Sequence, residues 1–152
     1  MPQSIGTGED AELACQNGVW AVYCSNHGGR QLDHGRGSAE VLPEIVEAVA
    51  GRAKVAVDGS FSRGSDIVKA ICMGADWVGL GRLYCYGLAA AGAAGIERVI
   101  ELLEEEMKEV MGLLGVSSLA QLDKSYIAKS MPTNLTGVHS AFPLLNLQDE
   151  GY

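Results

Sequence analysis

Residues 19–30, VWAVYCSNHGGR, decide the fold of this chain. The first half of the stretch, residues 19–24, is short, apolar throughout and rich in β-branched and aromatic side chains. Such a run is typical of a strand that is covered on both faces, as in a parallel sheet. The second half, residues 25–30, is polar and rich in glycine. We therefore expect a buried parallel strand whose carboxyl end carries an exposed polar loop.

The same pattern of apolar run and glycine-containing loop occurs twice more, at residues 54–60 and 75–82. Between and around the three runs, helical spacing of apolar residues predicts further elements. These are a helix that begins near Thr7, a helix over 40–50, a helix over 65–73 capped by Ser65, and helices over 84–90, 96–114 and 117–122. Strands that alternate with helices indicate an α/β fold with a parallel sheet, either doubly wound or a TIM barrel. Both architectures place functional residues at the carboxyl ends of the strands.

The composition of the chain argues against several kinds of partner and site. The chain has 152 residues, with 11 Lys plus Arg against 19 Asp plus Glu, which gives a net charge of −8. This acidic balance argues against nucleic acid as a partner, because phosphate backbones require a basic surface. The apolar runs are shorter than the ~18 residues that a membrane-spanning helix needs. The four cysteines form no CxxC pair and no metal-ligand spacing, so we expect reduced thiols, no metal site and a cytoplasmic protein.

The first loop pairs a histidine with an arginine three residues later. His27 can accept a proton near neutrality, as a general base must. Arg30 offers a planar pair of donors that matches a carboxylate. The glycines between them allow a ligand to approach the backbone closely. The loop suits an acidic small molecule, although a polar loop with a structural histidine is an equally open interpretation at this stage.

The loops after the other two strands suit a phosphate. Residues 58–66 run into a helix, and residues 79–82 end in Gly81-Arg82. Backbone N–H groups, a helix N-terminus and an arginine together form a typical anion site. TIM barrels commonly hold a phosphate at the loops after strands seven and eight. Each loop alone is compatible with an ordinary turn, so the prediction depends on their occurrence on consecutive strands.

Three blocks carry a resemblance to a known family. SNHGGRQLD at 25–33, DGSFSRGSDIVKA at 58–70 and GADWVGLGRLYCYGLAAAG at 74–92 are similar to the signatures of FMN-dependent 2-hydroxy-acid dehydrogenases and oxidases, with the wording closest to the mandelate dehydrogenase branch. The resemblance covers roughly residues 5–114 and implies a partial TIM barrel. Residues 1–116 are then its C-terminal half, with three to four parallel strands, one of them a remnant near residues 3–5. Residues 117–152 are a short helix and an extended tail.

The resemblance also implies a reaction and a role for each site residue. The family oxidises an (S)-2-hydroxy acid to a 2-oxo acid with FMN. His27 is expected to be the base, and Arg30 to bind the substrate carboxylate. The residues expected to bind FMN are Ser25, Asp58, Gly59, Ser60, Phe61, Ser62, Arg63, Gly81 and Arg82.

Three positions depart from the family pattern. A glycine is usual where Ser60 stands, although the mandelate branch tolerates the change. An arginine is usual at Ser62, where Arg63 is the neighbouring candidate to replace it. A lysine beside the flavin is usual at Gln3, and a neutral side chain cannot stabilise negative charge on reduced flavin.

Other interpretations compete with the complete enzyme. The implied N-terminal half of the barrel, with its substrate-holding side chains, is not evident in the sequence. A second hypothesis is therefore a catalytically silent barrel fragment that associates with itself or with a complementary half, because a small parallel sheet exposes its edges. A third is another phosphate-binding barrel of the IMP dehydrogenase type. Glu104 to Glu106 are expected on the solvent-facing side of their helix.

Overall fold

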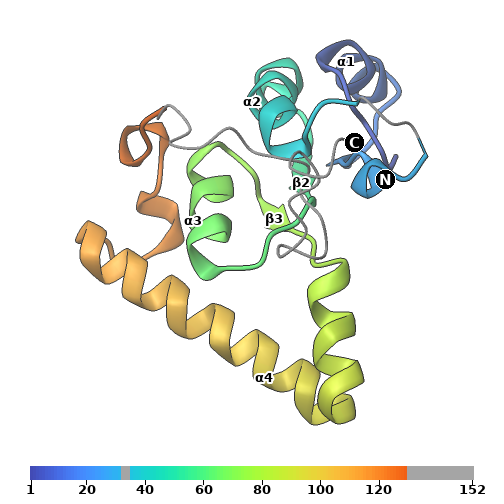
Figure 1. Ribbon diagram of the computed structural model, residues 1–152. Coiled ribbons are helices and arrows are strands. Elements are labelled where there is room, and N and C mark those ends of the chain that lie inside the picture. Colours follow the sequence, from blue (N-terminus) through green and yellow to red (C-terminus); the bar gives the residue numbers. More distant parts are fainter. Residues whose placement is uncertain (32–34, 130–152) are drawn as a thin grey trace, which may run out of the picture.

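A three-stranded parallel sheet lies at the centre of the computed structural model, which describes residues 1–31 and 35–129 (Figure 1). The strands lie in the order β1, β2, β3. The elements in chain order are α1 (Gly8–Gln16), β1 (Ala21–Cys24), the 3-10 turn η1 (His27–Gly29), α2 (Ser38–Val49), β2 (Lys54–Val57), α3 (Gly64–Cys72), β3 (Trp77–Val78), α4 (Arg82–Leu114), and the 3-10 turns η2 (Leu119–Gln121) and η3 (Lys124–Tyr126). The α/β class and the parallel sheet predicted from the sequence are confirmed.

A fourth segment pairs with the free edge of β1. Ile5 forms a parallel bridge with Cys24, and the N–H of Tyr23 donates to the carbonyl of Pro2 at 3.1 Å. The N–H of Ile5 in turn donates to the carbonyl of Tyr23 at 3.1 Å. The strand remnant expected near residues 3–5 is therefore present as a short bridge.

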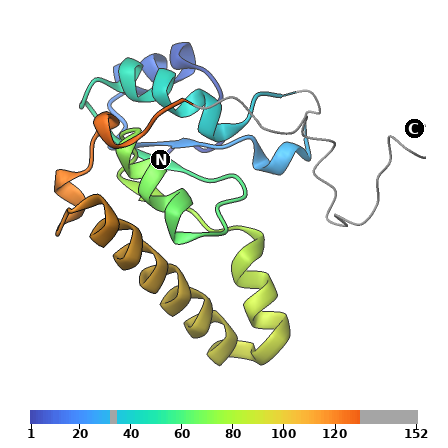
Figure 2. The same cartoon turned by 60° about the vertical axis from the view of Figure 1, so that its left-hand side comes forward.

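The main core lies between one face of the sheet and the helices α1 and α2, which stack side by side above it (Figures 1 and 2). Val22 and Val57 point into this core, where they meet the fully buried Leu42 and Ile45 of α2. A second cluster joins α3 to the last turns of α4 and to the residues after it, through Val68, Cys72, Val116 and Leu122. The segment after α4 therefore packs against α3 through the residues that flank η2, and the rest of the expected tail, residues 130–152, lies outside the described residues.

The opposite face of the sheet is less covered than the sequence predicts. The register sets Tyr23, Ala56 and Trp77 in one row across the three strands. Trp77 is 45% exposed, and Trp20 just before β1 is 64% exposed. The two indole rings meet edge to face, with their centroids 5.8 Å apart. The prediction that these strands are covered on both faces is wrong at their amino ends, where the tryptophans contact each other in solvent.

The long α4 contains the two helices predicted over 84–90 and 96–114, which form its two arms. It is one element that breaks sharply at Ala91 and Gly92, whose φ angles are −151° and 60°. Its two arms approach closely, because a Cβ on Gly87 would lie 2.5 Å from the carbonyl oxygen of Gly95. The first arm descends from β3, and the second returns beneath α3 (Figure 1). The turn at 117–122 is a single 3-10 turn instead of a helix.

Two further boundaries shift. The third strand is limited to β3, shorter than the run 75–80. The N-cap of α3 is Arg63 and not Ser65. Among residues 1–31 and 35–129, no helix combines the length and apolar character needed to cross a lipid bilayer.

Candidate active site at the carboxyl ends of the strands

The three predicted loops meet at one edge of the sheet. Since all strands are parallel, their carboxyl ends point the same way. The N–H of Asp58 donates to the carbonyl of Cys24, and the N–H of Gly79 donates to the carbonyl of Val57 at 2.7 Å. These bonds continue the sheet up to the loops, so the loops that follow β1, β2 and β3 begin side by side.

The loop after β1 holds His27 in an unusual conformation. Its φ is 53°, in the left-handed region that non-glycine residues rarely adopt. The His27 N–H donates to the hydroxyl of Ser25 at 3.1 Å, and the Asn26 side chain accepts from the N–H of Gly28 at 3.0 Å. Ser25 is buried, whereas the side chains of His27 and Arg30 are exposed. The loop therefore presents both predicted reactive groups at the surface, on a backbone that is held by hydrogen bonds. Residues with a strained backbone, such as His27, cluster at functional sites.

The N-terminus of α4 has the features of an anion site. Its N-cap is Gly81, which supplies no capping side chain, so the first N–H groups of the helix have no side-chain acceptor there. Arg82 is the first residue of this helix, and its guanidinium donates to the hydroxyl of Ser60 at 3.1 Å. The structure thus brings together Ser60, Gly81 and Arg82 from the loops after β2 and β3, as the sequence predicts.

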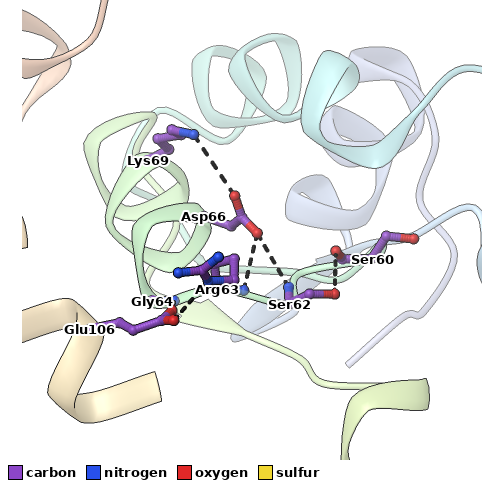
Figure 3. A network of polar contacts seen from close by, with 7 residues as sticks. All are labelled: Ser60, Ser62, Arg63, Gly64, Asp66, Lys69 and Glu106. Atoms are coloured by element: carbon purple, nitrogen blue, oxygen red, sulfur yellow. Dashed lines mark hydrogen bonds and ion pairs between the residues drawn. The ribbon is translucent and has the colours of Figure 1, made fainter. Parts of the chain in front are cut away.

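The N-terminus of α3 is already occupied by carboxylates, as Figure 3 shows. The Asp66 side chain accepts from the N–H groups of Ser62 at 3.3 Å and Arg63 at 3.1 Å. Glu106 of α4 accepts from the N–H of Gly64 at 2.6 Å and from Nε of Arg63 at 2.7 Å. The Arg63 guanidinium is therefore paired with Glu106, on the side of the loop away from Ser60 (Figure 3).

Glu106 is a residue whose role the sequence does not reveal. The expectation that it belongs to a solvent-facing acidic run is wrong, because its half-buried carboxylate holds the start of α3. No local signal could have shown this, since its partners lie 42 and 43 residues earlier in the chain.

A second unpredicted feature lies just beneath the loops. Oδ1 of Asp58 is buried and has no hydrogen-bond partner among the described residues. The hydroxyl of Tyr23 lies against Gly79, where an added Cβ would also lie 3.3 Å from the Cβ of Asp58. Burial raises the pKa of the Tyr23 phenol above its ordinary value, and the charge and hydrogen bonding of Asp58 add to the rise. The period-two alternation of β1, which sets Tyr23 on the same face as Ser25, is the sequence signal that points to this position.

Two of the remaining predicted residues, Gly59 and Phe61, lie in the loop after β2 and carry no polar side chain. The side chain of Phe61 is 7% exposed and belongs to the main core. Gly59 has a φ of 122°, and a Cβ there would lie 3.1 Å from the Ser38 hydroxyl. Gln3 is exposed beside the edge of β1, and Leu32 and Asp33 lie outside the described residues. No group of three or more metal-binding side chains occurs within the described part of the chain.

Comparison with known proteins identifies relatives at high similarity. The chain is 48% identical to L-lactate oxidase from Nostoc sp. over 125 residues, which cover 82% of this chain and 34% of that protein. It is 42% identical to human 2-hydroxyacid oxidase 1 over 130 residues, which cover 86% of this chain and 35% of that protein. The chain therefore spans about a third of the length of these relatives.

Solved structures agree with the sequence relatives. A mandelate oxidase superposes with a TM-score of 0.75 and 44% identity, over 78% of this chain and 36% of that protein. The monotopic membrane protein (S)-mandelate dehydrogenase superposes with a TM-score of 0.78 and 39% identity, over 82% of this chain and 33% of that protein. These neighbours are TIM-barrel flavoenzymes, which decides between the two architectures left open by the sequence. The family match extends over residues 4–129, and the chain belongs to the family of FMN-dependent dehydrogenases.

Proposed function

We propose that this chain carries the proton-accepting and phosphate-binding part of an FMN-dependent enzyme that oxidises an (S)-2-hydroxy acid to a 2-oxo acid. The observation that supports this most strongly is the shared position of the His27 loop and the Ser60–Arg82 pair at one edge of the sheet. The relatives include a lactate oxidase and a 2-hydroxyacid oxidase, which agree with an acidic substrate.

The residues present fit FMN. The uncapped start of α4 and the cationic Arg82 suit its phosphate, and the Ser60 hydroxyl beside them offers a further polar contact. The unpartnered Oδ1 of Asp58 requires a donor, and a ribityl hydroxyl is one. The other residues that we assign to the cofactor are Ser25, Gly59, Phe61, Ser62, Arg63 and Gly81. When bound, FMN supplies the acceptor for the hydrogen and the electron pair that leave carbon 2 of the substrate.

The substrate's acid and hydroxyl groups are assigned to the loop after β1. The Arg30 guanidinium pairs with the substrate carboxylate and fixes its orientation. The imidazole of His27 takes the proton of the 2-hydroxyl group, so that the oxygen becomes the carbonyl of the 2-oxo acid. The hydrogen bond from the His27 N–H to the buried Ser25 hydroxyl holds the base in a fixed place relative to the sheet.

A titration of the chain with FMN, followed by flavin fluorescence, tests the proposal. We expect saturable binding that Arg82→Ala weakens by about 10- to 100-fold, the usual loss for a charge-assisted hydrogen bond. Arg98→Ala is the matched control, because Arg98 pairs with Glu101 and Glu105 on the second arm of α4. Absence of binding at high micromolar FMN, or equal losses in both variants, contradicts the proposal.

A second candidate function is association without catalysis, either with another copy or with a complementary half of the barrel. The exposed Trp20 and Trp77 favour it, because neighbouring exposed aromatic side chains mark surfaces that become covered. Light scattering tests it, and a monodisperse monomer at working concentration counts against it. For either function we propose a cytoplasmic setting, supported by free cysteines at all four positions.

A further inference from the structure

A phenol and a carboxylate meet on the less covered face of the sheet, at the proposed cofactor site. Tyr23 stands in the middle of β1, and Asp58 follows the last residue of β2. The register sets Cys24 opposite Val57, so Asp58 lies next to Ser25, two residues beyond the row that contains Tyr23. The Tyr23 side chain spans these two residues, because its hydroxyl reaches Gly79, which follows β3.

Gly79 shows how tightly the phenol is held. A Cβ built on Gly79 would collide with the Tyr23 hydroxyl, and it would lie 3.2 Å from Cζ of the same ring. It would also lie 3.3 Å from the Cβ of Asp58. The phenol therefore occupies the space that a side chain at position 79 would need, directly beside the base of the Asp58 side chain.

The carboxylate of Asp58 is incompletely satisfied. Its Oδ1 is buried without a partner among the described residues, an arrangement that costs free energy unless a ligand supplies a donor. The neighbouring Tyr23 hydroxyl is a donor. Burial raises the pKa of this phenol, and the charge of Asp58 and hydrogen bonding to it add to the rise. A carboxylate that accepts a hydrogen bond from Tyr23 on the sheet side is held in one orientation. It keeps a lone pair that can accept a second hydrogen bond from a ligand on the loop side.

We propose that Tyr23 is a positioning residue of the flavin site, whose hydroxyl orients the Asp58 carboxylate so that it can accept a hydrogen bond from a ribityl hydroxyl of FMN. The inference depends on the proposed function, because it names the partner of a residue already assigned to the cofactor. It adds a contact within this chain that holds that residue in place before FMN binds, which lowers the ordering needed on binding.

The contact can be tested without any cofactor. The difference between the alkaline absorbance titrations of wild type and Tyr23→Phe gives the titration of Tyr23 alone. We expect it at higher pH than for an ordinary tyrosine, because burial and the neighbouring Asp58 raise the pKa of this phenol. In an Asp58→Asn background the Tyr23 curve should move toward lower pH. A Tyr23 curve that ignores Asp58→Asn overturns the inference, whether or not FMN binds.

The consequence for FMN is tested by a double-mutant cycle on the full 152-residue chain. Tyr23→Phe should weaken FMN binding about fivefold, the value of one typical intramolecular hydrogen bond, and should have no effect when Asp58 is already Asn. If wild type binds FMN and Tyr23→Phe binds it equally well, this inference fails while the proposed function stands. If wild type does not bind FMN, both fail together.

Gly79→Ala provides a second test that does not require FMN. The new methyl group collides with the Tyr23 hydroxyl, so Gly79→Ala should lower the unfolding midpoint, and adding Tyr23→Phe should restore part of the loss. Additive losses in the double variant overturn the placement of the hydroxyl.

Discussion

Gly64→Ala should destabilise the chain through one close contact between α3 and α4. Gly64 is the first residue of α3, and the second arm of α4 passes directly over it. A Cβ at this position would lie 2.5 Å from the backbone N of Met107 and 2.6 Å from both the Cβ of Glu106 and the carbonyl oxygen of Leu103. Because two of these three atoms are backbone, they cannot rotate out of the way, and the helices must move apart.

The size of the effect follows from the contact. Forcing one carbon into a packed site costs about 1–3 kcal/mol, and rigid backbone neighbours favour the upper half of that range. Separating α3 from α4 also weakens the bond from the Gly64 N–H to Glu106, which costs about 1 kcal/mol more. Alanine regains up to about 1 kcal/mol of helix propensity, so the net loss should be about 2–3 kcal/mol.

Urea unfolding followed by circular dichroism measures this loss. With a slope of about 2 kcal/mol per molar urea, the midpoint should fall by about 1–1.5 M. Gly112→Ala is the matched control, since a Cβ there meets nothing within 4 Å and should instead raise stability by about 0.5 kcal/mol. The reasoning is refuted if Gly64→Ala unfolds with the wild-type midpoint, or if both variants fall together.

Three further predictions concern single residues. Ala50 ends α2 in the left-handed conformation, with φ 49° and ψ 40°, so Ala50→Gly should stabilise the chain by about 1 kcal/mol in thermal unfolding. Ala89→Gly, in the exposed first arm of α4, should instead destabilise the chain by a similar amount. Hydrogen bonds from Arg52 and Gln16 lower the pKa of Glu12 to about 2 from 4.5. The extra stability of wild type over Glu12→Gln should therefore be complete above pH 4.5 and disappear as the pH falls toward 2. A stability difference that grows on acidification contradicts the pairing. Cys85 is exposed, whereas Cys24 is 1% exposed and burial raises the pKa of its thiol to about 11. A thiol reagent, followed by peptide mapping, should therefore label Cys85 rapidly and Cys24 only after unfolding.

The strands and their loops could be predicted from the sequence because the signals are local. An apolar β-branched run followed by a glycine-rich loop fixes both the buried strand and the edge at which the loop emerges. The pairing of Ser60 with Arg82 also follows, since parallel neighbouring strands bring their carboxyl ends together. The residues at which the helices begin and end could be predicted less well from the sequence. The start of α3 at Gly64 depends on the Asp66 carboxylate, which accepts from the N–H of the cap residue Arg63, two positions before the predicted cap Ser65.

The contacts that sequence reasoning missed are those made across long separations by residues of ordinary appearance. Glu106 resembles its neighbours Glu104 and Glu105, and only the return of α4 after its break at Gly92 carries it to the start of α3. Tyr23 resembles any aromatic residue in a buried strand. Its contact with Gly79 depends on β3 lying two strands away in the sheet, at a register that composition does not specify.

The two helix N-termini at this edge differ in a way that limits where a phosphate can bind. Both α3 and α4 begin after a strand, and both helix dipoles favour negative charge there. At α3 the carboxylates of Asp66 and Glu106 already supply that charge, and an incoming phosphate would meet them as like charges. At α4 the cap is a glycine, and the first helical residue is the cationic Arg82, which donates to the hydroxyl of Ser60. An anion is therefore favoured at α4 and opposed at α3, which is why Arg82 carries more weight in the proposed site than Arg63.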